Sequence, residues 1–221
     1  SSKAYLNEPN PNPVSLPYKA MSQVFLGEAT VFLHANEEKQ IKEGVKFLQD
    51  QKIKNIVVVG GTNSLEAADF MSKNNIKIAL EQPHNLPSME DEDVKSRFRL
   101  ASQLINKGVT VAVDPTGAMT RMNTRNLPFF AGSFSAYGVE KEKAVETITL
   151  NAAKVLGIEH NYGSIEVGKS ATLFISHGDA LDMRTNNLSH AYIDGREVSL
   201  ETNQTKLWQR YKKKVEEEKE Q

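Results

Sequence analysis

Short apolar runs alternate with amphipathic stretches along the first 158 residues of the chain. Four runs are apolar at nearly every position, which is typical of strands covered on both faces. These runs are residues 30–35, 56–61, 76–80 and 109–114. A helical spacing of apolar positions follows each run, as in residues 37–51, where Ile41, Val45 and Leu48 share one face. The pattern therefore predicts four strand–helix units in series.

Strand–helix units in series form parallel sheets with right-handed crossovers. A complete (β/α)8 barrel needs about 250 residues, so this part of the chain has room for four of its eight units. We expect an α/β fold in which residues 23–158 form half of a TIM-type (β/α) barrel. Residues 1–22 are expected to be a loop or the remnant of a preceding element, because their prolines oppose a regular helix or a central strand.

The pattern changes after residue 158. Residues 163–169 are predicted to form a strand with a tight turn, and residues 171–175 a second strand. The Asp194-Gly195 pair is a signal for a β-hairpin. We therefore expect residues 159–202 to form a small antiparallel β segment of a β-sandwich.

Charge is balanced over the chain, with 27 Lys and Arg residues, 28 Asp and Glu residues and a net charge of −1. This balance argues against binding to nucleic acids or anionic membranes, which usually requires a basic surplus. Charged residues dominate residues 203–221, which are expected to form a C-terminal helix or tail. The absence of Cys excludes disulfides, thiolate metal sites and cysteine nucleophiles. No apolar run reaches membrane-spanning length, and residues 1–17 do not have the pattern of a targeting segment, so the compartment stays open.

Three segments in the second half of the chain carry ordered motifs. Residues 149–158 read TLNAAKVLGI, residues 163–173 read GSIEVGKSATL, and residues 194–198 read DGREV. In this order and at this spacing they resemble the T-x-N-A-A-K-x-L-G, G-S-x-E-x-G-K-x-A-D-L and closing V-x-x-x-G-x-x-V motifs of the amidohydrolase superfamily. The resemblance extends from about residue 31 to residue 211 and is nearest to the imidazolonepropionase-like branch.

The resemblance implies a barrel that binds a divalent metal, zinc first of all, at the C-terminal ends of its strands. Metal-activated water would attack a C–N bond in a cyclic amide, an amidine or a small peptide. His34 matches the fifth-strand metal ligand of the family, and Asp114 matches its eighth-strand catalytic aspartate. The sixth strand of the family ends in a ligand histidine, but this chain has residues 59–62, VGGT, at that place. The ligands of the first barrel strand would lie upstream of this chain.

Three more polar side chains are candidates for substrate binding. His84 follows the third strand, and Arg125 and Asn126 follow the fourth, so all three can face the mouth of a barrel. Solvated loop positions remain the alternative for all three residues. His34 could equally be a lone histidine bonded to a loop, and Asp114 could form an Asx turn.

Three functions remain open at this point. The first is a metal-dependent hydrolase of C–N bonds acting on a small molecule, and the second is a non-catalytic homologue that acts as a binding or partner subunit. The third is an unrelated four-stranded module that binds a phosphate-bearing ligand at residues 60–62, before a helix N-terminus. A half barrel leaves two open strand edges and an uncovered core. We therefore expect association with a partner, either a copy of this chain or an upstream barrel half.

Overall fold

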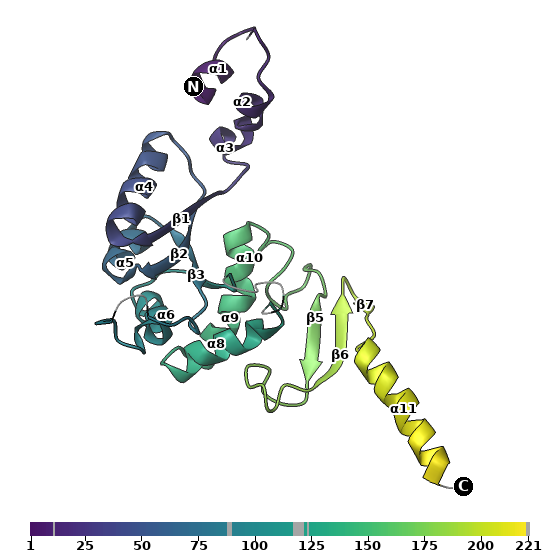
Figure 1. Cartoon of the computed structure of the whole chain (residues 1–221). Coiled ribbons are helices and arrows are strands. Elements are labelled where there is room, and N and C mark those ends of the chain that lie inside the picture. Colours follow the sequence, from purple (N-terminus) through teal and green to yellow (C-terminus); the bar gives the residue numbers. More distant parts are fainter. Residues whose placement is uncertain (11, 88–89, 117–121, 123, 220–221) are drawn as a thin grey trace.

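Four parallel strands form the central sheet of the protein, shown here as a computed structural model (Figure 1). The structure describes residues 1–10, 12–87, 90–116, 122 and 124–219. The strands lie in chain order: β1 (Val31–Glu37), β2 (Ile56–Asn63), β3 (Lys77–Glu81) and β4 (Val111–Asp114). All three neighbouring pairs are parallel. The predicted series of four strand–helix units is confirmed.

The helices that follow each strand cover one face of this sheet. They are α4 (Glu38–Asp50), the pair η1 (Leu65–Ala67) and α5 (Ala68–Lys73), α6 (Ser96–Asn106), and after β4 the helices α8 (Leu127–Ala136) and α9 (Lys141–Ile148). Alternate strand residues, among them Val58, Ile78 and Val111, pack with these helices in one large core cluster. Because successive strand side chains point to opposite faces, the intervening residues lie on the other face, which would be the inside of a barrel.

After β4, the polypeptide crosses from one face of the sheet to the other at a break between two helices. The spacing of apolar residues over positions 140–156 predicts one continuous helix. This prediction is wrong, because Thr149 has φ −125° and ψ −95° and separates α9 from α10 (Leu150–Leu156). Val155 on α10 packs with Val57 and Ala112, which belong to the inner face of the sheet. Helix α10 therefore covers part of the face that a complete barrel would enclose.

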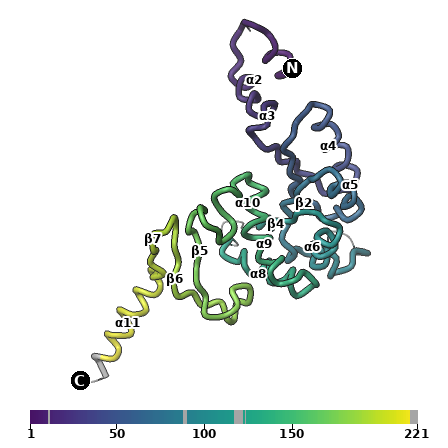
Figure 2. Tube along the Cα trace, turned by 180° about the vertical axis from the view of Figure 1, so that it is seen from behind, coloured from purple at the N-terminus to yellow at the C-terminus, as the bar shows by residue number. Residues whose placement is uncertain are grey.

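The C-terminal part contains a separate antiparallel sheet, as predicted. Its strands are β5 (Leu173–Ser176), β6 (Leu188–Ile193) and β7 (Arg196–Glu197), followed by helix α11 (Asn203–Lys219). The hairpin between β6 and β7 is confirmed, since Asp194 and Gly195 both have positive φ, at 50° and 77°. Helix α11 extends away from the sheet, at the end opposite to the N-terminal helices (Figure 2).

One sequence prediction outside the main sheet is corrected by the structure. Residues 163–169 form turns rather than a strand, and Ile165 and Val167 are exposed. Gly163 and Gly168 have φ of +96° and +95°, which bends the backbone away from an extended path.

Residues 1–22 were expected to be a loop or the remnant of a preceding element. They contain α1 (Ser2–Leu6), α2 (Leu16–Ala20) and the start of α3 (Ser22–Leu26). Pro17 lies in the first turn of α2, where the missing N–H costs no hydrogen bond. Among the described residues, no helix is both long enough and apolar enough to cross a membrane.

Candidate functional site

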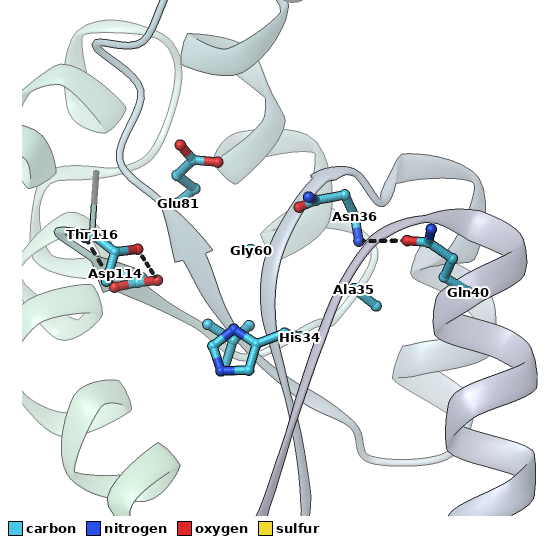
Figure 3. Close-up of a pocket in the computed structure, with 9 residues that line it drawn as sticks. His34, Ala35, Asn36, Gln40, Gly60, Glu81, Asp114 and Thr116 are labelled. Carbon is cyan, nitrogen blue, oxygen red and sulfur yellow. Dashed lines mark hydrogen bonds between the residues drawn. The ribbon is translucent and has the colours of Figure 1, made fainter. Parts of the chain in front are cut away.

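A pocket of about 300 Å³ opens at the C-terminal ends of the four parallel strands (Figure 3). It is lined by His34, Ala35, Asn36, Gln40, Val59, Gly60, Glu81, Asp114 and Thr116. This edge of the sheet is where barrel enzymes place their chemistry. The two residues that the sequence singled out most strongly, His34 and Asp114, therefore lie in one pocket although they come from β1 and β4.

Asp114 is the last residue of β4 and only 9% of its surface is exposed. Its two carboxylate oxygens accept hydrogen bonds from Thr116, one from the backbone N–H at 3.0 Å and one from the hydroxyl at 2.6 Å. This is the Asx-type turn considered as an alternative for this residue. Asp114 can form this turn and line the pocket at the same time, because Thr116 holds the Asp114 carboxylate in one orientation toward the pocket.

The end of β2 is built around two glycines and cannot carry a ligand side chain. Gly60 has φ +96°, and a Cβ atom there would lie 2.6 Å from Oδ1 of Asn36. The pairing of β1 with β2 is irregular between Ala35 and Glu37, and this irregularity directs Asn36 toward β2. Its Oδ1 accepts a hydrogen bond from the Thr62 N–H at 3.5 Å. Asn36 thus occupies the space in front of Gly60, where the family motif would have placed a histidine.

Helix α4 begins beside the same pocket. The side chain of Gln40 reaches back and accepts a hydrogen bond from the N–H of Asn36 at 3.1 Å (Figure 3). It also accepts one from the N–H of Glu37, at 3.3 Å. This is half of a capping box, which fixes the start of the helix against the end of β1.

Glu81 is a second carboxylate of the pocket that the sequence analysis missed. It ends β3 and is paired in register with Asp114 on the neighbouring strand. The amide of Asn85 donates a hydrogen bond to its Oε1, and Gln82 donates to Oδ1 of Asn85 at 2.8 Å. The available signal was the same as for Asp114, namely an acidic residue directly after a buried apolar run.

His84 lies elsewhere, in a second pocket with Ser133, Asp179 and Arg184. Its Nε2 lies 2.7 Å from the Ser133 hydroxyl, which itself donates to the Phe129 carbonyl at 3.0 Å. Because that hydroxyl uses its proton on the carbonyl, His84 must donate from Nε2. Desolvation by burial lowers the pKa of His84 and favours the neutral ring.

Arg125 and Asn126 lie in η2 (Thr124–Asn126), and Asn126 is the residue before α8. Neither residue lines the pocket at the strand ends. The loop between them and Thr116 includes residues 117–121 and 123, which lie outside the described residues. The structure therefore places His34 and Asp114 together and leaves His84, Arg125 and Asn126 outside their pocket.

The described part of the chain does not contain a complete metal centre. No group of three or more His, Asp and Glu side chains with metal-binding geometry occurs among the residues that the structure describes. Catalytic zinc sites use three protein ligands and leave one position open. His34 and Asp114 supply two of these at most, and Gly60 excludes a third from β2.

Comparison with known proteins adds to this description. The sequence profile of the amidohydrolase family matches residues 34–198, which is most of the chain. No curated protein matched the sequence.

Several solved structures share the fold. An amidohydrolase from Thermotoga maritima MSB8 superposes with a TM-score of 0.75 at 22% identity, over 89% of this chain and 50% of that one. A Xaa-Pro dipeptidase with bound methionine in the active site gives 0.57 at 22% identity, over 77% and 45% of the two chains. An adenosine deaminase from Xanthomonas campestris with bound zinc gives 0.54 at 17% identity, over 80% and 49%.

The chain spans about half the length of the solved structures that it matches. Its four strand–helix units accordingly correspond to half of an amidohydrolase barrel. The family match, the half-barrel fold and the position of the pocket at the strand ends agree with one another. This chain belongs to the amidohydrolase family.

Proposed function

We propose that this chain is one half of a hydrolase that cleaves a C–N bond in a small molecule. The substrate is a cyclic amide, an amidine or a small peptide, and the place of the chain is in the imidazolonepropionase-like branch of its family. The proposal is carried by one observation: His34 and Asp114, on separate strands, line a single pocket at the C-terminal edge of the sheet. The rest of the barrel would come from an upstream half or from another chain.

Asp114 is suited to act as a general base. Its carboxylate would accept a proton from water while the water oxygen bonds to the carbon of the substrate. The same proton would then pass to the leaving nitrogen as the C–N bond breaks, which returns Asp114 to its carboxylate form. Thr116 supports this role because its two hydrogen bonds orient the carboxylate.

Zinc would have to be held jointly with residues from outside this chain. The adenosine deaminase with bound zinc supports zinc as the metal in this fold, and His34 and Asp114 are the two ligands that this chain would offer. Two ligands are too few for a catalytic zinc site.

A second candidate is a non-catalytic homologue that serves as a binding or partner subunit. It is favoured by the end of β2, where Asn36 fills the space in front of Gly60 and no ligand can be placed. The two candidates differ in whether the pocket performs chemistry, and this difference can be measured.

The experiment compares Asp114→Asn with the parent protein in its full natural length. Hydrolysis is followed on a panel of cyclic amides, amidines and dipeptides. Loss of a general base is expected to lower kcat by about 100-fold or more. Asp69→Asn is the matched control, because Asp69 is exposed on α5 and pairs with Lys107 away from the pocket.

An unchanged rate in Asp114→Asn would overturn the assigned role of this residue. A folded parent protein that hydrolyses nothing on the panel and contains no zinc by elemental analysis would favour the non-catalytic candidate.

A further inference from the structure

The charge of the pocket at the strand ends is one-sided. Glu81 and Asp114 bring two carboxylates, and none of the nine described lining residues is a lysine or arginine. Neither carboxylate forms an ion pair with another described residue. A concave site lined by one sign of charge concentrates ligands of the opposite sign.

The two carboxylates are not equivalent. Both oxygens of Asp114 accept hydrogen bonds from Thr116, whereas Glu81 accepts one, at Oε1 from Asn85. In the described part of the chain, Oε2 of Glu81 accepts none. Among the described residues, Glu81 therefore has one oxygen without a hydrogen-bond donor, while Asn85 holds the other oxygen of the same carboxylate.

The strand register brings the backbones of the two acids together, since Glu81 and Asp114 are direct partners on adjacent parallel strands, which lie about 4.8 Å apart. Both side chains also line the same pocket of about 300 Å³. A group held at Glu81 therefore lies in the cavity that the proton acceptor lines. A planar amidinium or guanidinium group fits this arrangement. Its N–H groups can donate to the oxygens of a carboxylate, and its central carbon lies between the nitrogens that donate.

We infer that Glu81 selects substrates with a positively charged amidinium or guanidinium group and holds that group beside Asp114. The inference rests on the proposed function for the choice of pocket and names the substrate class of that site. Glu81 is a specificity residue here, while Asp114 retains the proton transfer.

The test compares two probes of the same shape, benzamidine, which is cationic, and benzamide, which is neutral. Their affinities for the full-length protein are measured by isothermal titration calorimetry at pH 8 in the presence of EDTA. We expect benzamidine to bind about tenfold more tightly, the ratio that one charge-assisted hydrogen bond supplies. Glu81→Gln keeps the shape of the side chain and removes its charge, so this preference should disappear.

Glu142→Gln is the matched control, since Glu142 is exposed in the first turn of α9, far from the strand ends in the chain. It should leave both affinities unchanged. If Glu81→Gln does not fold, Asn85→Ala provides a second variant. It retains the charge but releases the carboxylate, so benzamidine binding should weaken several-fold while benzamide binding stays the same.

Equal binding of the two probes to the parent protein would overturn the inference, as would a preference that survives in Glu81→Gln. Binding of Mg²⁺ or Ca²⁺ in EDTA-free buffer that blocks benzamidine, with no benzamidine preference in EDTA, would assign the acids to a metal instead. The proposed hydrolysis is tested separately. A Glu81-dependent preference without hydrolysis would support the role of Glu81 in binding the cation and contradict the proposed hydrolase activity. Hydrolysis without the preference would support the hydrolase activity and contradict the role of Glu81.

Discussion

Gly60 and Gly61 lie in the second half of β2 and have φ angles of +96° and +65°. Both angles lie in the region that residues with a Cβ rarely adopt. At Gly60 the side chain of Asn36 also stands in the way, with Oδ1 2.6 Å from the place of a Cβ atom. The backbone conformation therefore disfavours a side chain at this position, and Asn36 would have to move to admit one.

Gly60→Ala is predicted to lower the free energy of unfolding by about 1–2 kcal/mol from the backbone alone, with a further loss from the contact with Asn36. Urea denaturation followed by circular dichroism measures the change. Gly168→Ala is the control, because Gly168 has nearly the same φ, +95°, but no atom lies within 4 Å of its Cβ position. Equal losses of stability in the two variants would show that the Asn36 side chain moves aside at no cost. No loss of stability in Gly60→Ala would contradict the backbone restraint at this position.

At the scale of elements, the break at Thr149 gives α9 and α10 different partners. Ala144 on α9 belongs to the core between the sheet and its helices, whereas Val155 on α10 packs on the inner face. Asn151 anchors α10 there, since its side-chain amide donates to the Val111 carbonyl at 3.1 Å and the residue is 8% exposed. The asparagine of the family-like T-x-N-A-A motif thus has a structural task in this chain.

Asn151→Ala should destabilise the protein by about 1–3 kcal/mol, because a buried carbonyl of β4 loses its donor. The same variant should speed amide hydrogen exchange in β4 more than in β1, since α10 contacts β4 directly. Asn106→Ala, at the exposed end of α6, serves for comparison. A stability loss without faster exchange in β4 would indicate that Asn151 acts within its own helix rather than as an anchor.

At the scale of the whole molecule, four parallel strands make an open sheet with β1 and β4 at its edges. The inner face is covered by α10 near β2 and β4, but Phe32 on β1 is 41% exposed. An eight-stranded barrel has no edges, and its interior is filled with side chains. We expect the exposed part of the inner face to be the surface on which a partner packs.

We expect this chain to associate when it is isolated, either with its own copy or with an upstream barrel half. Sedimentation velocity over a range of concentrations measures this. Phe32→Gln should weaken the association, because it replaces an apolar contact of the inner face, whereas Val94→Gln, exposed outside the four strands, should not. A monodisperse monomer with low binding of an apolar dye would contradict the expectation.

The sequence by itself determined the strand–helix alternation, the change to a β segment, and the positions of His34 in β1 and of Asp114 at the end of β4. These features depend on local periodicity and on the rule that parallel strands end at one edge, so no distant contact was needed to predict them. Glu81 had the same local signal as Asp114, and only the register between β3 and β4 showed that the two acids share a pocket.

Tertiary structure alone decided three further points. The packing of α9 and α10 on opposite faces of the sheet divides the predicted single helix at Thr149. Tertiary structure placed His84 in a different pocket, beside Ser133 of α8. It also put Asn36 in front of Gly60, through an irregularity in the pairing of β1 and β2. Each depends on where two segments distant in sequence meet, and a pattern along one segment carries no information about the position of the other.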